Sequence, residues 1–97
     1  MKLIKRNGSE VDFDKEKIRI AIEKANAAVD EQYRITDAQI SKITDKVTKA
    51  CAKMTHSVNV EEIQDMVERE LMDIKAFVLA KKYITYRYTR ALVRRSN

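Results

Sequence analysis

The sequence predicts an α+β domain in which a small N-terminal β-hairpin is covered by four helices. The chain has 97 residues, 44% of them hydrophobic, which is enough for the core of one domain. It contains one glycine and no proline, whereas an all-β sandwich needs many turn residues. From residue 14 onward, apolar residues recur at helical spacing. We therefore expect residues 1–97 to form a single domain.

The hairpin is predicted from the Asn7-Gly8 pair, because Asn-Gly is the favoured filling of a two-residue type I′ turn. Pairing around such a turn places Ile4 opposite Val11, with Phe13 on the same face. Two strands alone are only marginally stable, so helices must cover this apolar face.

The first two helices are marked by capping residues that precede apolar stripes. Asp14 is the expected N-cap of a helix that ends near Asp30. Its apolar stripe is Ile18, Ile22, Ala25 and Val29. Thr36 and Gln39 form a capping box for a second helix, which is expected over roughly residues 36–54. Its apolar stripe is Ile40, Ile43, Val47, Cys51 and Met54.

Two further helices follow a short connector, in which Val58 is expected to add a third short strand. Asn59 and Glu62 form a capping box for the third helix. Its apolar stripe is Ile63, Val67, Leu71 and Ile74. The fourth helix is expected from about Lys75. Its apolar stripe is Phe77, Ala80, Ile84, Tyr88 and Leu92.

Charge and composition limit the classes of function. The net charge of +5 favours an anionic partner, and no acidic residue follows Asp73, so the predicted fourth helix carries the positive excess. A single cysteine, Cys51, excludes an intramolecular disulfide and a cysteine-based zinc cluster, and we expect it to be a small buried hydrophobe. Gly8 alone cannot make a glycine-rich phosphate loop, so a phosphate site must use side chains and helix ends. No segment resembles a signal peptide or a membrane span, so we expect a cytoplasmic protein without a membrane partner.

The first group of candidate binding residues surrounds the predicted hairpin turn. Lys5 and Arg6 precede the turn, and Asp14 and Lys17 begin the first helix a few residues later. Cations beside a helix N-terminus favour an anion there. An edge strand whose cations only discourage aggregation explains the same residues, and strict alternation puts Lys5 and Arg6 on opposite faces.

A second group lies on the last two predicted helices. Tyr86 and Arg90 are four residues apart and share a helix face, which would offer a stacking surface beside a guanidinium group. The same tyrosine is also explained as amphipathic cover for the core. Val60 and Gln64, one turn apart, would supply an apolar contact and an amide. His56 has no acid or nucleophile partner nearby in the sequence, so no catalytic triad is predicted.

Taken together, several segments resemble the ATP-cone, a regulatory nucleotide-binding domain found at the N-terminus of many ribonucleotide reductases. The ending, residues 86–97 (YRYTRALVRRSN), looks most like the anaerobic glycyl-radical ribonucleoside-triphosphate reductases. The resemblance implies a small sheet capping a four-helix bundle, and a domain excised from a longer reductase or an independent regulator. The segments that carry it are residues 3–9 (LIKRNGS), 11–14 (VDFD), 17–18 (KI), 60–65 (VEEIQD) and 83–87 (YITYR).

The resemblance also implies an allosteric function without catalysis in this domain. ATP, with Mg²⁺ carried by the nucleotide, would permit activity of the reductase, and dATP would suppress it through a change of oligomeric state. The expected partners are adenine nucleotides, the remaining reductase chain and a second copy of this chain. The resemblance assigns these residues to the nucleotide site: Lys5, Arg6 and Arg90 at the phosphates, Asp14, Lys17 and Ile18 beside ribose and base, Val60 and Gln64 along the nucleotide, and Tyr86 closing the pocket.

Two positions depart from the family pattern, and two alternatives stay open. Val11 and Gln64 stand where some aerobic relatives have a glutamate that helps to read adenine and a histidine near the sugar. Base and sugar recognition is therefore expected to differ. The family's transcriptional repressor also carries an ATP-cone, but it places a Cys-x-x-Cys zinc ribbon before the domain, which this chain lacks. A basic helical module that binds nucleic acid is the alternative from another class.

Overall fold

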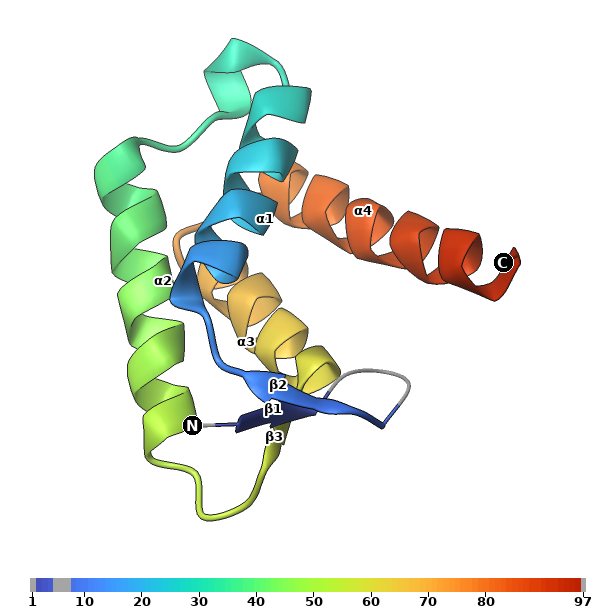
Figure 1. Ribbon diagram of the computed structural model, residues 1–97. Coiled ribbons are helices and arrows are strands. Elements are labelled where there is room, and N and C mark those ends of the chain that lie inside the picture. Colours follow the sequence, from blue (N-terminus) through green and yellow to red (C-terminus); the bar gives the residue numbers. More distant parts are fainter. Residues whose placement is uncertain (1, 5–7, 97) are drawn as a thin grey trace.

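The computed structural model of the chain describes residues 2–4 and 8–96, with only the backbone described for Lys2, Val11 and residues 88–96 (Figure 1). It confirms the α+β class, with a small sheet at one end of four helices. In chain order the elements are β1 (Lys2–Ile4), β2 (Glu10–Asp12), α1 (Lys15–Ala28), the short 3-10 helix η1 (Glu31–Tyr33), α2 (Asp37–Ala52), β3 (Val58–Asn59), α3 (Val60–Asp73) and α4 (Phe77–Ser96).

The sheet has three strands in the order β2-β1-β3, which confirms the third strand expected at Val58. β1 pairs antiparallel with β2 and parallel with β3. Because β3 passes into α3 without an intervening residue, the parallel pairing joins the hairpin directly to a helix of the bundle.

The predicted hairpin register is wrong by one residue. Leu3, not Ile4, pairs with Val11, and Ile4 pairs with Glu10. Five residues, 5–9, lie between Ile4 and Glu10. A two-residue turn leaves an even number of residues between any two residues that face each other, so this connection is not such a turn. Gly8 has a left-handed φ of 86°, as glycine often has in longer hairpin connections. A shift of one residue exchanges the two faces of a strand, so Leu3 rather than Ile4 packs against the core.

The capping predictions for α1 and α2 are confirmed. The Asp14 side chain accepts a hydrogen bond of 3.0 Å from the backbone N–H of Glu16. Thr36 and Gln39 form the reciprocal capping box at the start of α2. The stripes predicted for both helices are buried, apart from Met54, which packs at the margin of the core.

α3 starts where the sequence predicts, and α4 starts two residues later than predicted. Asn59 caps α3 by accepting a hydrogen bond of 2.9 Å from the N–H of Glu62. Lys75 has a left-handed φ of 63° and ends α3 in a Schellman motif. In that motif the N–H of Lys75 donates to the carbonyl of Met72, and the N–H of Ala76 donates to the carbonyl of Leu71, both at 2.9 Å. Lys75 is therefore part of a turn and cannot begin α4.

The predicted apolar stripe of α4 is also wrong in part. Phe77 and Ile84 are 55% and 37% exposed, while Leu79, Ala80 and Tyr83 are buried. Residues 77–80 are all apolar, so the sequence does not show which side of this turn faces inward. α1 and α3 both pack against α4, and their positions select the face that is buried. Ile74, expected in the stripe of α3, lies in the turn and is 41% exposed.

Each of α1 and α3 packs against both α2 and α4, and these contacts enclose one hydrophobic core. In Figure 1 the C-terminal end of α4 extends away from the other three helices. Within the described part of the chain, no helix has the length and apolar character needed to cross a membrane. The core residues are Ile18, Ile22, Ala25, Val29, Ile40, Ile43, Val47, Cys51, Val58, Ile63, Val67, Leu71, Leu79, Ala80 and Tyr83.

Lys75→Gly is expected to raise the free energy of unfolding by about 0.5–1 kcal/mol, because glycine adopts a left-handed φ without a Cβ clash. Urea unfolding at constant m-value measures the change. Lys75→Ala is the matched control, since it removes the same charge but keeps the Cβ atom. Equal changes in the free energy of unfolding of both variants would show that the stabilisation does not come from the backbone conformation at residue 75.

The Cys51 thiol is expected to react slowly in the folded protein. The side chain is 1% exposed, and burial, followed by the negative charge of Glu62, raises its pKa. A raised pKa lowers the fraction of reactive thiolate at neutral pH. Modification by a disulfide reagent should be at least about tenfold slower than in urea-unfolded chain. Equal rates in the folded and unfolded states would show that this part of the core opens readily.

Candidate functional site

The pairing of β1 with β3 brings the end of β1 beside the start of α3. Ile4 pairs with Asn59, which is both the last residue of β3 and the N-cap of α3. Lys5 and Arg6 follow Ile4 in the chain, and both lie outside the described residues. The chain thus enters the tip next to the first turn of α3, where unpaired backbone N–H groups give a helix a partial positive charge.

The position of Lys5 and Arg6 relative to the start of α1 lies outside the described residues, but the described strands show where α1 begins. β2 runs away from the tip, and Asp12 at its end pairs with Lys2 at the opposite end of β1. α1 begins just after that far end. Three residues of strand span only about 7–10 Å, so an extended nucleoside triphosphate is long enough to contact both ends of the sheet. Asp14 and Lys17 are exposed in the first turn of α1, whereas Ile18 is 7% exposed and belongs to the core.

Val60 and Gln64 are half-buried in the first two turns of α3. The Oε1 atom of Gln64 is buried, and no described residue donates a hydrogen bond to it. A buried acceptor without a donor costs about 1–3 kcal/mol. A ligand with an N–H or O–H group at this position would therefore be favoured.

Glu62 has a different environment from Gln64, although it lies only two residues earlier on α3. Like Oε1 of Gln64, its Oε2 atom is buried and accepts no hydrogen bond from a described residue, but it lies 3.4 Å from Nε2 of His56, an ion pair when the histidine is protonated. The same carboxylate helps to raise the pKa of Cys51. Two residues apart on a helix do not share a face. Glu62 is therefore not part of the surface that Val60 and Gln64 share.

On α4, Tyr86 is half-buried and lies close to Tyr83, which is 4% exposed. Burial raises the pKa of the Tyr83 phenol, so this group is uncharged at neutral pH. Arg90 follows Tyr86 by four residues on the same helix, and its side chain lies outside the described part of the structure. The described residues thus bring Gln64, Val60 and the end of β1 together at the start of α3, and they do not test the positions of Lys5, Arg6 or the Arg90 guanidinium.

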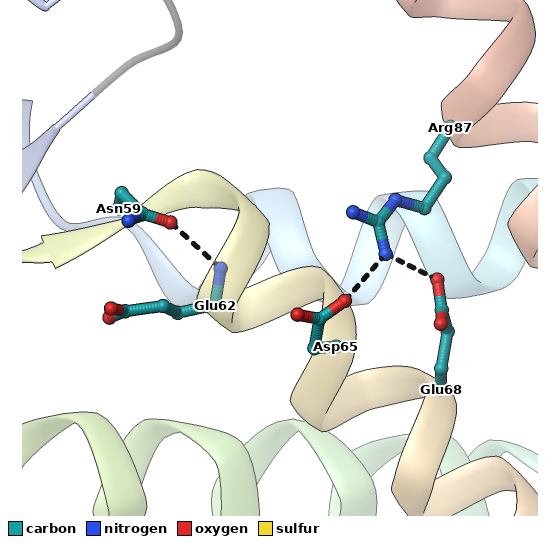
Figure 2. A network of polar contacts seen from close by, with 5 residues as sticks. All are labelled: Asn59, Glu62, Asp65, Glu68 and Arg87. Atoms are coloured by element: carbon teal, nitrogen blue, oxygen red, sulfur yellow. Dashed lines mark hydrogen bonds and ion pairs between the residues drawn. The ribbon is translucent and has the colours of Figure 1, made fainter.

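A charged cluster between α3 and α4 was not predicted from the sequence (Figure 2). Nη1 of Arg87 donates to Oδ1 of Asp65 at 2.9 Å and also to the Glu68 carboxylate. The side chains of Arg87 and Glu68 are 19% and 18% exposed, whereas Asp65 is 63% exposed. Burial lowers the pKa of Arg87, but the hydrogen bonds and charges of Glu68 and Asp65 outweigh it, and the pKa is raised.

The sequence did contain a signal for this cluster, namely opposite charges on consecutive helices. The acidic residues of α3 are Glu61, Glu62, Asp65, Glu68, Glu70 and Asp73. The basic residues of α4 are Lys81, Lys82, Arg87, Arg90, Arg94 and Arg95. Arg87 belongs to the positive excess of the chain, but its charge is compensated by α3.

The described groups are suited to binding a polar anionic ligand. Among the residues that the structure describes, no group of three His, Cys, Asp or Glu side chains is placed to hold a metal ion. The described features that bear on a ligand are the N-terminus of α3 beside the end of β1, an exposed lysine on α1 and a buried acceptor on α3 without a described donor. The first two favour an anion, and the acceptor favours a ligand that also carries a hydrogen-bond donor.

Comparison with known proteins agrees with this arrangement. The model of the ATP cone domain matches residues 1–92. The ribonucleoside-diphosphate reductase subunit alpha of Chlamydia muridarum is 35% identical over 97% of this chain and 10% of its own length. The anaerobic ribonucleoside-triphosphate reductase of Escherichia coli is 33% identical over 95% of this chain and 12% of its own length.

A relative of another kind is the transcriptional repressor NrdR of Leptothrix cholodnii. It is 39% identical over 78% of this chain and 51% of its own length. By contrast, the chain spans only about a tenth of the length of the reductases that it matches. The match to the family model over residues 1–92, on a fold with the expected sheet and four helices, shows that the chain belongs to the ATP-cone family.

Proposed function

We propose that residues 1–97 form one regulatory domain of a ribonucleotide reductase, which binds an adenine nucleotide as an allosteric effector. The observation that carries this proposal is the pairing of Ile4 with Asn59, because it sets Ile4, the residue before Lys5 and Arg6 in the sequence, beside the N-cap of α3. Membership of the ATP-cone family, whose domains bind nucleotide effectors, supports the same function.

In the proposed site the hairpin, α1, α3 and α4 each contact part of the nucleotide. Lys5 and Arg6 in the hairpin and Arg90 on α4 would hold the phosphates, with Mg²⁺ carried by the nucleotide. The buried Oε1 atom of Gln64, which lacks a donor among the described residues, supports a contact with a sugar hydroxyl or a base N–H. The remaining contacts are proposed for Asp14, Lys17, Ile18, Val60 and Tyr86.

The proposed regulation has ATP permitting and dATP suppressing reductase activity in the cytoplasm. The two nucleotides differ by one hydroxyl, so the domain must contact that part of the sugar differently in two conformations or assemblies. We propose that the suppressed state is a nucleotide-dependent self-association that involves the rest of the reductase.

A second candidate is the ATP-cone of a transcriptional regulator, which the similarity to NrdR favours. Both candidates predict nucleotide binding, but only the second requires an association with DNA. A titration with duplex DNA over a salt series separates them, because binding through phosphate contacts weakens steeply with salt. The same titration tests the simpler alternative of a basic nucleic-acid-binding module.

Isothermal calorimetry should show that the chain binds ATP with Mg²⁺ and does not hydrolyse it. Arg6→Ala and Arg90→Ala should each weaken binding about ten- to a hundredfold, because each removes a charge-assisted phosphate contact. Arg95→Ala, near the C-terminal end of α4, is the control with the same loss of charge and should bind nearly as well as wild type. Equal weakening in all three variants would indicate a diffuse electrostatic patch, and hydrolysis abolished by a site variant would contradict a purely regulatory domain.

Gln64→Ala should narrow the difference between ATP and dATP in affinity or in induced association, because it removes the buried acceptor proposed to meet the sugar. Calorimetry and size-exclusion chromatography with each nucleotide measure this difference. Gln64→Glu is the companion variant, since it keeps an acceptor of the same length. If Gln64→Ala leaves the difference undiminished, other residues discriminate between the sugars, with Lys17 or the connector at residues 55–59 as the next candidates.

A further inference from the structure

We propose that Arg87 is a positioning residue of the nucleotide site, which holds α4 against α3 through Asp65 and Glu68 so that Arg90 can reach the phosphates. This inference rests on the proposed function. Arg87 does not touch the nucleotide in this proposal. It acts through the direction of α4, on which Tyr86 and Arg90 lie.

The geometry of the cluster is that of a bridge between two helices. In Figure 2 the Arg87 side chain extends from α4 toward α3 and ends between the carboxylates of Asp65 and Glu68. These two residues lie three apart, on neighbouring turns of α3, and both accept hydrogen bonds from the same nitrogen, Nη1. Sliding α4 along the axis of α3 would lengthen at least one of the two hydrogen bonds, and the less exposed Glu68 makes the larger contribution to holding the helix.

The position of the bridge along α4 explains how it would affect Arg90 in the proposed nucleotide site. Leu79, Ala80 and Tyr83 anchor the first half of α4 in the core. Arg87 comes one turn after Tyr83, is the last residue of α4 whose side chain the structure describes, and bridges to α3. Arg90 follows by three residues, so its backbone position depends on the turn that Arg87 holds.

The charges argue against Arg87 as a direct phosphate ligand. One guanidinium and two carboxylates give the cluster a net charge of −1. Its Arg87 and Glu68 side chains are mostly buried, so their attraction is screened less than that of an exposed pair. Both printed hydrogen bonds use Nη1, so a phosphate that approached the remaining guanidinium donors would face two carboxylates against one guanidinium. The negative excess of the cluster disfavours Arg87 as a phosphate ligand and is compatible with a role in holding α4.

The test compares ATP affinity and thermal stability in a set of variants of the whole chain. Arg87→Met and Glu68→Gln each break the bridge from one side, and both should weaken ATP binding about tenfold in the folded protein, as expected for a misplaced contact group. Lys82→Met removes one positive charge from an exposed position on α4 and should leave the affinity close to that of wild type. Circular dichroism confirms that each variant is folded before calorimetry.

The exchange of both charges, Arg87→Glu with Glu68→Arg, separates positioning from direct contact. It re-forms an ion pair between α3 and α4 and should restore most of the affinity that Arg87→Met loses. In an Arg90→Ala background, Arg87→Met should have little further effect, because the contact that it positions is already absent. Should Arg87→Met fail to fold, Arg87→Lys and Glu68→Gln provide the same comparison with a weaker perturbation.

Three results would overturn the inference. A lower melting temperature with unchanged ATP affinity in Arg87→Met and Glu68→Gln would make the bridge purely structural. Undiminished binding in Glu68→Gln, together with no rescue by the charge exchange, would make Arg87 a direct ligand. If the wild-type chain does not bind ATP, the proposed function is wrong and this inference with it. If the wild-type chain binds ATP and the variants bind it with the same affinity, this inference alone is wrong.

Discussion

Burial of the apolar face of α3 is the interaction on which the rest of the structure depends. Val67 and Leu71 have no exposed surface, and Ile63 is 5% exposed. Each such side chain contributes about 1.5–3 kcal/mol when it is fully buried. α3 packs against α2 and α4, and β3 leads directly into it and pairs with β1. Loss of this face would therefore release the sheet and the last helix together, and with them every group of the proposed site.

The polar face of the same helix determines how its neighbours are oriented. Glu70 pairs with Lys46 of α2 at 3.3 Å, but Lys46 is 59% exposed, and such pairs contribute only about 0–1 kcal/mol. Arg87 and Glu68 are mostly buried, and in such a pair the removal of one partner leaves a charge without compensation. Charge therefore adds little to the stability of α3 against α2, whereas between α3 and α4 it fixes the relative position of two helices.

Local signals in the sequence were sufficient for most of the fold. Asp14 and Thr36 mark helix starts because a capping side chain bonds within its own turn, so no distant residue is involved. The predictions fail where residues distant in the sequence determine the local structure. The hairpin register depends on the conformation of its connection, and the buried face of α4 depends on where α1 and α3 lie. Lys75 adopts a left-handed φ that the sequence does not signal, because glycine usually marks that position.

The same distinction applies to the candidate site. Tyr86 with Arg90 and Val60 with Gln64 were predicted from helical spacing alone, since each pair lies within one helix. The sequence associated the hairpin cations with α1, the next helix in the chain, and gave no sign that the end of β1 pairs beside the start of α3, as Ile4 does with Asn59. Three short connections link the end of β1 to α4: the parallel strand pair, the cap at Asn59 and the bridge at Arg87. A ligand that displaces the end of β1 would therefore act on α3 as well, and through Arg87 on the direction of α4.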